Sequence, residues 1–450
     1  MRVLASTSIV GGLLSAERRA ELTPVIRRLL AVRLLRSLAQ GTLVVDFALY
    51  LQALGWSGTQ IGLVLAGAGL SNTAFAVVVG PLSDRIGRQR LLVAYQGIAL
   101  VTAIVAVLTA APLLLVQAAV LGSFGRGANG TAGGFSPAEQ AWLAEAAPAV
   151  ARPWIFGLNS ALGFFGMGVG AALGATPALF ATWLPGPLAY RPLFIFTALV
   201  ALTGAVILAR TEERYRRLRT SPEERAAAQP VRRQENRLLL ALSGINALGG
   251  ASIGLTGPLI SYWFAVRFGL GPEDIAPVLA ISFLLTAGAS IAAGRIAESA
   301  GVIRSVVVGR VVGLLCLLAI PFAPTYPLAA AAYAGRSIFS RGTAGPRQAL
   351  VVGLVREQRR GLAVSVSNAS LQLPASIGPA VAGPLIEAGL LDLPFYVASV
   401  LQAVFLVGYA RLLRPYEPPR RTRVAGTARA DQTTVLPGDL IVPEELDDPA

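Results

Sequence analysis

Apolar stretches of about twenty residues alternate with short polar or Pro/Gly-rich breaks along most of the chain. A helix of that length rises about 30 Å, which is the thickness of the hydrocarbon core of a bilayer. Each stretch is therefore predicted to be a membrane-spanning helix. The twelve predicted spans are residues 34–54, 59–81, 91–110, 112–134, 153–176, 189–209, 238–264, 274–297, 304–322, 326–348, 361–386 and 393–413.

Polar segments divide these spans into two groups of six. Residues 211–237 are dense in Arg and Glu and form the predicted cytoplasmic linker between an N-terminal half, residues 33–210, and a C-terminal half, residues 238–414. We expect residues 1–32 to be a cytoplasmic segment. Residues 415–450 lack apolar periodicity and are predicted to be a disordered cytoplasmic tail.

Composition and charge agree with a membrane protein. Of 450 residues 54% are hydrophobic and only 14% are charged, which is more apolar surface than a soluble domain hides. The basic residues are all arginines, and almost all fall at the termini, in even-numbered loops or in the linker. The positive-inside rule then predicts that both termini and the linker lie in the cytoplasm, and we expect the membrane to be a prokaryotic inner membrane. Topology and anionic lipid account for the net charge of +14 better than a nucleic-acid partner does.

Residue types that the chain lacks exclude several chemistries. It has no His, and its single cysteine, Cys316, lies inside a predicted span, so no intrachain disulfide is possible. We find no nucleotide-binding loop, nucleophile triad or metal cluster. We therefore expect neither an enzyme nor a metal or cofactor requirement, and a monomer whose partners are a small-molecule substrate and the lipid bilayer.

The chain repeats itself at an offset of about 214 residues. G-x-x-x-D-x-x-G after the second span recurs as G-x-x-x-E-x-x-G after the eighth. The paired residues are Gly80 with Gly294, Asp84 with Glu298, and Gly87 with Gly301. A second shared pattern, F-x-R-G-x-x-G, surrounds Arg126 in span 4 and Arg341 in span 10. The common order indicates two parallel six-helix halves related by an axis along the membrane normal, with a solute site between them.

Residues 80–90 read G-P-L-S-D-R-I-G-R-Q-R and resemble the loop 2-3 signature of the major facilitator superfamily, G-x-L-x-D-R-x-G-R-[KR], with Gln89 as the departure. With the twelve-span layout, the resemblance covers about residues 30–413. It implies the fold of that superfamily and transport by alternating access.

The resemblance also implies a gate at the cytoplasmic side. Asp84 would face the N-terminus of span 11 near Gly361, where the helix dipole favours a carboxylate by about 0.3–1 kcal/mol. Arg85 and Arg88 would add ion pairs, whereas Glu298 would form a looser latch in the second half. The expected gating residues are Gly80, Asp84, Arg85, Gly87, Arg88 and Arg90.

Asp46 is the most informative acidic residue. It follows Arg36 by ten residues in span 1, so we place it about 15 Å inward and near the midplane. Intramembrane carboxyl groups mark functional sites, and this one is a candidate for proton uptake and release. The alternative is a structural role in which Asp46 pairs with an arginine or caps polar neighbours.

Arg126 is the natural partner of Asp46, and its surroundings, L-x-x-x-x-R-x-x-x-G, are similar to the span 4 arginine of facilitator-superfamily antiporters. It could instead bind an anionic substrate or extend to the cytosolic interface, and Arg341 has the same three options. Further candidate cavity residues are Gln40, Tyr50, Asn129 and Asn246, although each is also suited to a helix–helix hydrogen bond. So few polar residues favour a hydrophobic or amphiphilic solute over a hexose.

Small residues in span 5 resemble the antiporter signature G-x-x-x-G-P-x-x-G-G, with alanine in place of the proline and of the last glycine. These glycines, Gly166, Gly170 and Gly174, are expected to pack spans 5 and 8 closely. The missing proline has a counterpart in span 11, where Gly378 precedes Pro379.

The sequence therefore predicts a proton-coupled exporter of a hydrophobic or amphiphilic compound, driven by the proton gradient, in which protonation of Asp46 is exchanged against substrate. One alternative is uptake of a small organic anion, held by Arg126, or of another metabolite. An alternative of another class is a non-transporting membrane scaffold or receptor on the same fold.

Overall fold

The computed structural model describes residues 21–125, 135–148, 151–213, 229–343 and 360–413, together with single positions between 343 and 360. Every regular element within these ranges is a helix. The first group is α3 (Pro24–Ala53), α4 (Gly58–Ile86), α5 (Arg88–Leu108), α6 (Pro112–Gly122), α7 (Ser136–Ala146), α8 (Arg152–Leu173), α9 (Thr176–Phe180), η3 (Gly186–Tyr190) and α10 (Arg191–Ala209). The second is α12 (Gln229–Thr256), α13 (Ile260–Phe268), α14 (Pro272–Ala300), α15 (Val302–Phe322), α16 (Tyr326–Arg341), α18 (Arg360–Glu387) and α19 (Leu393–Leu413).

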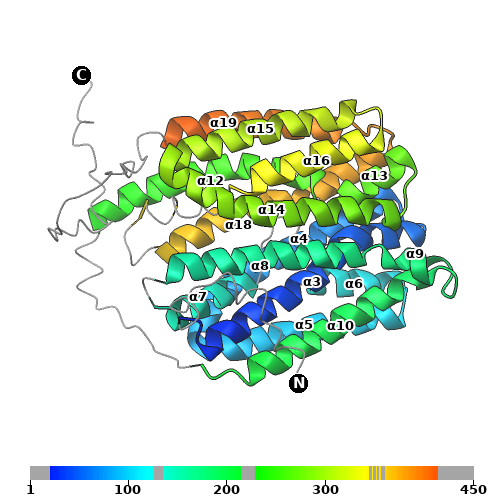
Figure 1. The fold of residues 1–450 in the computed structure, drawn as a ribbon, viewed down its shortest axis with the longest axis horizontal. Helices are drawn as coiled ribbons and strands as arrows, with labels where there is room; N and C mark the ends of the chain where they lie inside the picture. The colour runs from blue at the N-terminus through cyan, green and yellow to red at the C-terminus, as the bar shows by residue number, and fades with distance from the viewer. Residues whose placement is uncertain are drawn as a thin grey trace.

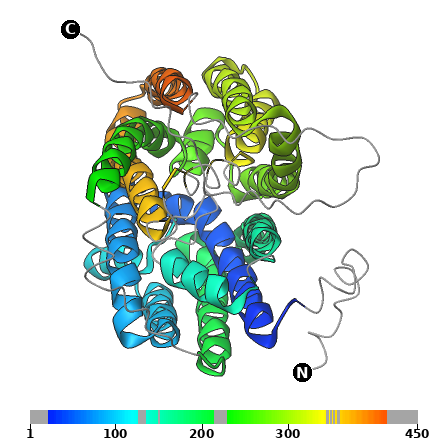
Figure 2. The same ribbon diagram turned by 90° about the vertical axis from the view of Figure 1, so that its left-hand side faces the viewer.

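The two groups form two bundles that lie side by side (Figure 1). We call the end at which α10 finishes and α12 begins the linker end, and the opposite end the far end. Figure 2 looks onto the linker end, with the second bundle above the first. The same packing recurs in both: α3 packs on α8 as α12 packs on α18, and α5 on α10 as α15 on α19. The fold is therefore two parallel halves with one helical arrangement.

Two equivalent glycines show the repeat in the backbone itself. Gly87 precedes α5 with φ 94° and ψ 142°, and Gly301 precedes α15 with φ 95° and ψ 145°. This positive-φ conformation is readily available only to glycine. The turn between the second and third helices of each half is thus built in the same way, at an offset of 214 residues.

Each predicted span has a helix at its position. Nine helical stretches of the described residues are long and apolar enough to cross a membrane. The three other predicted spans correspond to α6, which is a shorter apolar helix, and to α16 and α18. Prolines at the first or second position start many of these helices, since a proline there sacrifices no helical hydrogen bond.

Two spans predicted as continuous are interrupted. The helix of predicted span 4 ends at Gly122, because Ser123 is left-handed at φ 55° and Gly125 follows at φ 68°, while residues 126–134 lie outside the described part. Predicted span 7 breaks between α12 and α13, where Gly257 and Pro258 follow Thr256. A proline provides no N–H for the helical ladder. Broken membrane helices usually face protein or a cavity rather than lipid.

The apolar core shows which end of the molecule is closed. One buried cluster at the far end contains residues of both halves, from Phe47 and Phe194 to Phe264 and Phe395. Toward the linker end the core divides into two separate clusters, one within each half. Among the residues that the structure describes, the halves therefore share a core only at the far end.

Close helix contacts seal the far end between the halves. The backbone N–H and hydroxyl of Thr59 in α4 donate to Glu387 in α18 at 2.8 and 2.5 Å. A side chain at Gly62 would clash with the carbonyl of Pro379. On the other side of the bundle, Gly168 of α8 lies against Leu284 of α14. These two helix pairs hold the halves together at this end.

Candidate functional site

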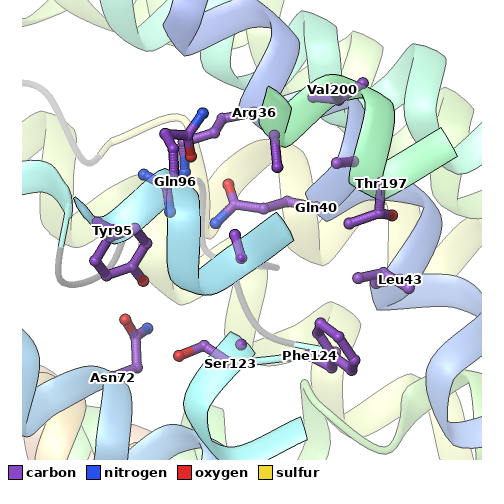
Figure 3. A pocket seen from close by; sticks show the side chains of 15 residues that line it. Arg36, Gln40, Leu43, Asn72, Tyr95, Gln96, Ser123, Phe124, Thr197 and Val200 are labelled. Carbon is purple, nitrogen blue, oxygen red and sulfur yellow. The ribbon is translucent and has the colours of Figure 1, made fainter. Parts of the chain in front are cut away.

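A polar cavity of about 60 Å³ lies inside the N-terminal half, among α3, α4, α5, α6 and α10, and has room for a few water molecules. Figure 3 shows the side chains that line it, with Arg36, Gln40, Asn72, Gln96 and Ser123 among apolar neighbours such as Leu43 and Phe124. The cavity therefore combines an apolar wall with convergent polar groups, as small-molecule sites do.

Gln96 and Arg36 direct unpaired polar atoms toward this region. Gln96 is fully buried, and within the described residues neither its amide oxygen nor its nitrogen has a hydrogen-bond partner. It fits only because Gly204 of α10 has no side chain to meet it. Arg36 has its guanidinium 4.2 Å from the ring centre of Phe135 and 5.0 Å from that of Tyr95, so two cation–π contacts hold it.

An ion pair lies just toward the linker end of the cavity. Arg33 of α3 reaches Glu139 of α7 at 4.0 Å, and both side chains are buried. Gly163 of α8 makes this possible, because a Cβ there would lie 2.5 Å from the guanidinium. The sequence analysis did not single out either charge, since Glu139 lies in an inter-span segment. Its place two residues after Pro137, within S-P-A-E-Q-A-W-L, was the available signal.

Asp46 is buried with only 1% of its surface exposed, and neither carboxylate oxygen has a hydrogen-bond partner among the described residues. It lies against Gly174 at the end of α8, where a Cβ would be 2.7 Å from Oδ2. Seven residues separate it from the end of α3, a rise of about 10 Å. Asp46 is thus nearer the far end than its spacing from Arg36 predicts. Its expected partner, Arg126, lies outside the described residues.

Of the further predicted cavity residues, Gln40 lines the cavity, whereas Tyr50 and Asn246 contribute to helix packing. Tyr50 is buried in an aromatic cluster, with ring centres 5.6 Å from Tyr190 and 5.2 Å from Phe194. Asn246 of α12 donates to the hydroxyls of Ser367 and Ser370 in α18 at 3.0 and 3.4 Å. The Asn246 contacts are the helix–helix hydrogen bonds that the sequence left open, while Tyr50 packs through its ring.

Arg341 ends α16 and extends over aromatic rings. Its Nη2 donates to the Tyr333 hydroxyl at 3.2 Å, and its guanidinium lies 5.2 Å from the ring centre of Phe283. Two further arginines of this half, Arg310 in α15 and Arg336 in α16, are more than nine-tenths buried. The sequence analysis did not select them, although an arginine inside an apolar span is itself a signal.

Within the predicted gating motif, the structure describes the side chain of Arg88 but not those of Asp84 and Arg85. Arg88 forms an ion pair with Glu145 of α7 and donates to the carbonyl of Ala141 at 3.1 Å. Its described contacts are therefore within the N-terminal half. Arg90 is exposed. The predicted meeting of Asp84 with Gly361 involves side-chain positions outside the described set, and so do the roles of Gly80, Gly294 and Glu298.

Gln89, the departure from the family signature, holds the motif to the end of α10. Its amide nitrogen donates to the carbonyls of Leu208 and Ala209 at 3.1 and 3.0 Å. In return, the Glu213 carboxylate accepts from the backbone N–H groups of Arg88 and Gln89 at 2.9 and 2.8 Å. Glu213 thereby caps α5, whose preceding residue Gly87 has no side chain to do so.

The glycines of span 5 pack against a different helix from the one predicted. Side chains at Gly166 and Gly170 would clash with the backbone of α3 at Leu34 and Leu38, and Gly174 faces Asp46. The prediction that these three glycines pack spans 5 and 8 is therefore wrong, and Gly168 makes that contact. Parallel neighbouring helices approach closely wherever small residues face each other, and sequence spacing does not show which neighbour is faced.

Gly378 and Pro379 act in the matching helix of the other half. A Cβ on Gly378 would clash with the backbone of Gly254 in α12, while the carbonyl of Pro379 meets Gly62 of α4. These residues thus connect α18 both to its own half and across to the N-terminal half.

A bundle of two repeated six-helix halves, with buried charges and small residues at its helix contacts, defines a multi-pass membrane transporter. The sequence matches the family model described as Major Facilitator Superfamily over residues 29–335 and 242–443. The chain belongs to this superfamily and is a transporter, not an enzyme.

Known proteins similar to this chain share its fold at low sequence identity. The Saccharomyces cerevisiae uncharacterized membrane protein YJR124C is 23% identical over 414 residues, covering 84% of this chain and 91% of the relative. The structure of the nucleoside transporter NupG matches with a TM-score of 0.67 at 13% identity, covering 86% of this chain and 99% of that one. A D-xylose–proton symporter matches at 0.65 and 15% identity, with coverages of 86% and 96%.

A third structure shares the arrangement of the halves. It is a bacterial homologue of the human lysosomal transporter Spinster in an inward-facing and occupied conformation. The TM-score is 0.65 at 16% identity, covering 89% of this chain and 98% of that one.

Proposed function

We infer that this transporter is a proton-coupled exporter of a hydrophobic or amphiphilic small molecule. The observation that supports this most is Asp46, a buried carboxyl group without a hydrogen-bond partner among the described residues. An ionisable side chain is expensive inside a membrane and is seldom kept there without a task. A carboxyl group that binds a proton in one conformation and releases it in the other couples the proton gradient to transport.

The position of Asp46 suits a coupling site. It lies on α3 against α8, beneath the far-end core that both halves share. Opening of the far end would separate α4 from α18 and α8 from α14, and would bring water to Asp46. In the present arrangement, the shared core covers this region. Access to the proton site would then change together with access to the solute.

Orientation completes the proposal. The arginine distribution supports a cytoplasmic linker end in an inner-membrane protein, and with its far end sealed the structure would then be the inward-facing state. Asp84, Arg85 and Arg88 would close the linker end in the opposite state. Rocking of the two halves, which would separate the helices at the Gly62–Pro379 and Gly168–Leu284 contacts, would exchange the two states.

A similar structure supports the proposed proton coupling, and the lining of the cavity supports the proposed class of solute. The D-xylose–proton symporter shows that this fold accommodates coupling to protons. The lining of the cavity of the N-terminal half combines polar groups with apolar side chains such as Leu43, Phe124 and Val200. Such a lining suits an amphiphile better than a solute with many hydroxyl groups.

The test is proton movement in proteoliposomes during transport of a panel of amphiphiles, with wild type compared with Asp46→Asn. We expect at least one compound to move against protons, and Asp46→Asn to abolish this coupled flux. The matched control is Asp274→Asn, which alters an exposed carboxylate at the start of α14. Flux that is independent of protons, or indifferent to Asp46, would contradict the proposal. Absence of flux under every gradient would favour a scaffold or receptor.

A further inference from the structure

The C-terminal half contains a group of arginines that we call the C-half arginine cluster: Arg310, Arg336, Arg341 and Arg347. Arg336 donates from Nη2 to the Thr256 hydroxyl at 2.8 Å. Arg310 has its guanidinium 4.7 Å from the ring centre of Phe405. Arg310 is close enough to Arg336 and Arg347, and Arg336 to Arg341, for their charges to repel one another.

Carboxylates do not balance this charge among the described residues. Among these residues, the four arginines lie near hydroxyl groups, aromatic rings and one another. The buried acidic residue of the described C-terminal half, Glu235, is 21 residues before Thr256 on α12, a rise of about 31 Å. The N-terminal half differs, because there Glu139 lies beside Arg33.

Each arginine also retains donor capacity. Buried guanidinium nitrogens without a hydrogen-bond partner in the described part include Nε of Arg310 and Nη1 of Arg336, Arg341 and Arg347. Adjacent like charges in a low-dielectric interior are strongly unfavourable, and an anion between them removes that repulsion. The planar guanidinium presents paired donors that match carboxylate, sulfonate and phosphate groups.

The cluster occupies a position suited to a solute. Arg336 is ten residues from the far-end start of α16, which is a rise of about 15 Å, close to half the thickness of the membrane. Its partner Thr256 lies where the helix breaks between α12 and α13. At the offset of 214 residues, Arg310 is the counterpart of Gln96, which lines the cavity of the N-terminal half.

We propose that the transported solute carries an anionic group, which the C-half arginine cluster binds through Arg336 and Arg341. This inference rests on the proposed transport function and specifies the charge of its solute. It differs from an anion site at Arg126, since the residues that carry it belong to the other half. The solute would be an amphiphilic anion, with its apolar part against apolar side chains of the helices and its charged group bound to the arginines.

The test measures binding without any gradient, so that it does not depend on flux. Full-length protein in nanodiscs of zwitterionic lipid is titrated with three probes that share the naphthalene ring system: 1-naphthalenesulfonate, 1-naphthalenemethanol and 1-naphthalenemethylamine. We expect the sulfonate to bind most tightly. Arg336→Gln should weaken the sulfonate by about tenfold to a hundredfold, as loss of a charge-assisted hydrogen bond does, with little effect on the alcohol.

Controls distinguish charge recognition from misfolding and from lipid binding. Arg341→Gln, at a half-buried position, provides a second variant, and Arg411→Gln removes an exposed arginine of the same half and should bind like wild type. Equal binding of the three probes, or unchanged sulfonate affinity in both cluster variants, would overturn the proposal. Binding of an anionic lipid at the cluster without binding of the sulfonate would also overturn the proposal. If only the proton-coupling proposal is wrong, flux will not depend on Asp46, but the protein will still bind the sulfonate more tightly than the alcohol and the amine.

Discussion

Among the described residues, Arg33 of α3 and Glu139 of α7 are buried charges that lie 4.0 Å apart. Glu139→Gln would remove the negative charge beside Arg33 and the neighbouring Arg36. Breaking a buried pair in this way costs about 3–5 kcal/mol, so we expect a clear fall in the unfolding temperature of the purified protein.

A control for this prediction lies on the same helix. Glu145 pairs with Arg88 and is 37% exposed, and an exposed ion pair contributes about 0–1 kcal/mol. Glu145→Gln should therefore unfold at nearly the wild-type temperature. Equal losses in the two variants would show that burial does not decide the strength of these pairs.

Glu213 provides a second prediction at the scale of single residues. Its carboxylate accepts from the N–H groups of Arg88 and Gln89 at the start of α5, so Glu213→Gln removes the charge from a helix cap. Loss of a cap costs about 0.5–2 kcal/mol. Thermal unfolding should fall by a corresponding amount, whereas Glu212→Gln, at the adjacent exposed position, should not change it. The same loss at both positions would indicate a general charge effect.

The sequence identified residues better than it identified their partners. Asp46 was predicted as a buried carboxyl group because an acidic residue in an apolar span has few alternatives. Its depth was misjudged because Arg36 served as the membrane boundary, although Arg36 is buried over two aromatic rings. The exposed Arg28, which donates to the carbonyl of Arg210, is the better marker of the linker end. Local spacing does not show which arginines a neighbouring helix covers.

At the scale of helices, the contact between α3 and α8 depends on backbone approaching backbone. A side chain at Gly170 would clash with the carbonyl of Leu38, and one at Gly41 would clash with that of Met167. We therefore expect Gly170→Ala to destabilise the protein by about 1–3 kcal/mol, as overpacking does. Thermal unfolding and expression of monodisperse protein measure this loss.

Gly157 supplies the matched position within α8. A Cβ there meets no neighbouring atom within 4 Å, so Gly157→Ala adds only helix propensity, which favours alanine by up to about 1 kcal/mol. Stability should stay the same or rise. If Gly170→Ala were equally harmless, close approach of the two backbones would not be what holds α3 to α8.

Helices were more predictable than their interruptions. Hydropathy located all twelve spans, because apolar stretches of membrane length have few other uses. It did not reveal that the span 4 helix stops at Gly122 or that span 7 divides at Gly257 and Pro258. These breaks occur within apolar sequence, so averaged hydropathy does not detect them. The glycines and the proline are the local signals of a break. The glycines of span 5 were recognised as packing residues, but their partner was not, since it depends on how the helix is rotated.

At the scale of the molecule, the two halves share a backbone plan but differ in buried charge. Among the described residues, the buried charges of the N-terminal half are two carboxylates, Asp46 and Glu139, and two arginines, Arg33 and Arg36. Those of the C-terminal half are Arg310, Arg336 and the distant Glu235. Because the fold is a repeat, this difference cannot come from the architecture. It agrees with a proposed proton site in one half and a proposed anion site in the other, an arrangement in which movement of the halves would affect both ligands.

Movement between the halves requires the far end to open, and this can be blocked. Thr59 of α4 and Glu387 of α18 meet there, with Oγ1 and Oε2 2.5 Å apart. In a Cys316→Ala background, Thr59→Cys with Glu387→Cys should form a disulfide on oxidation and stop transport in proteoliposomes, because the solute could then reach its site only from the linker end. Reduction should restore transport, and each single-cysteine variant should be insensitive to oxidant. Full transport by the crosslinked protein would show that these two helices do not separate during the cycle, and the rocking mechanism would have to be abandoned.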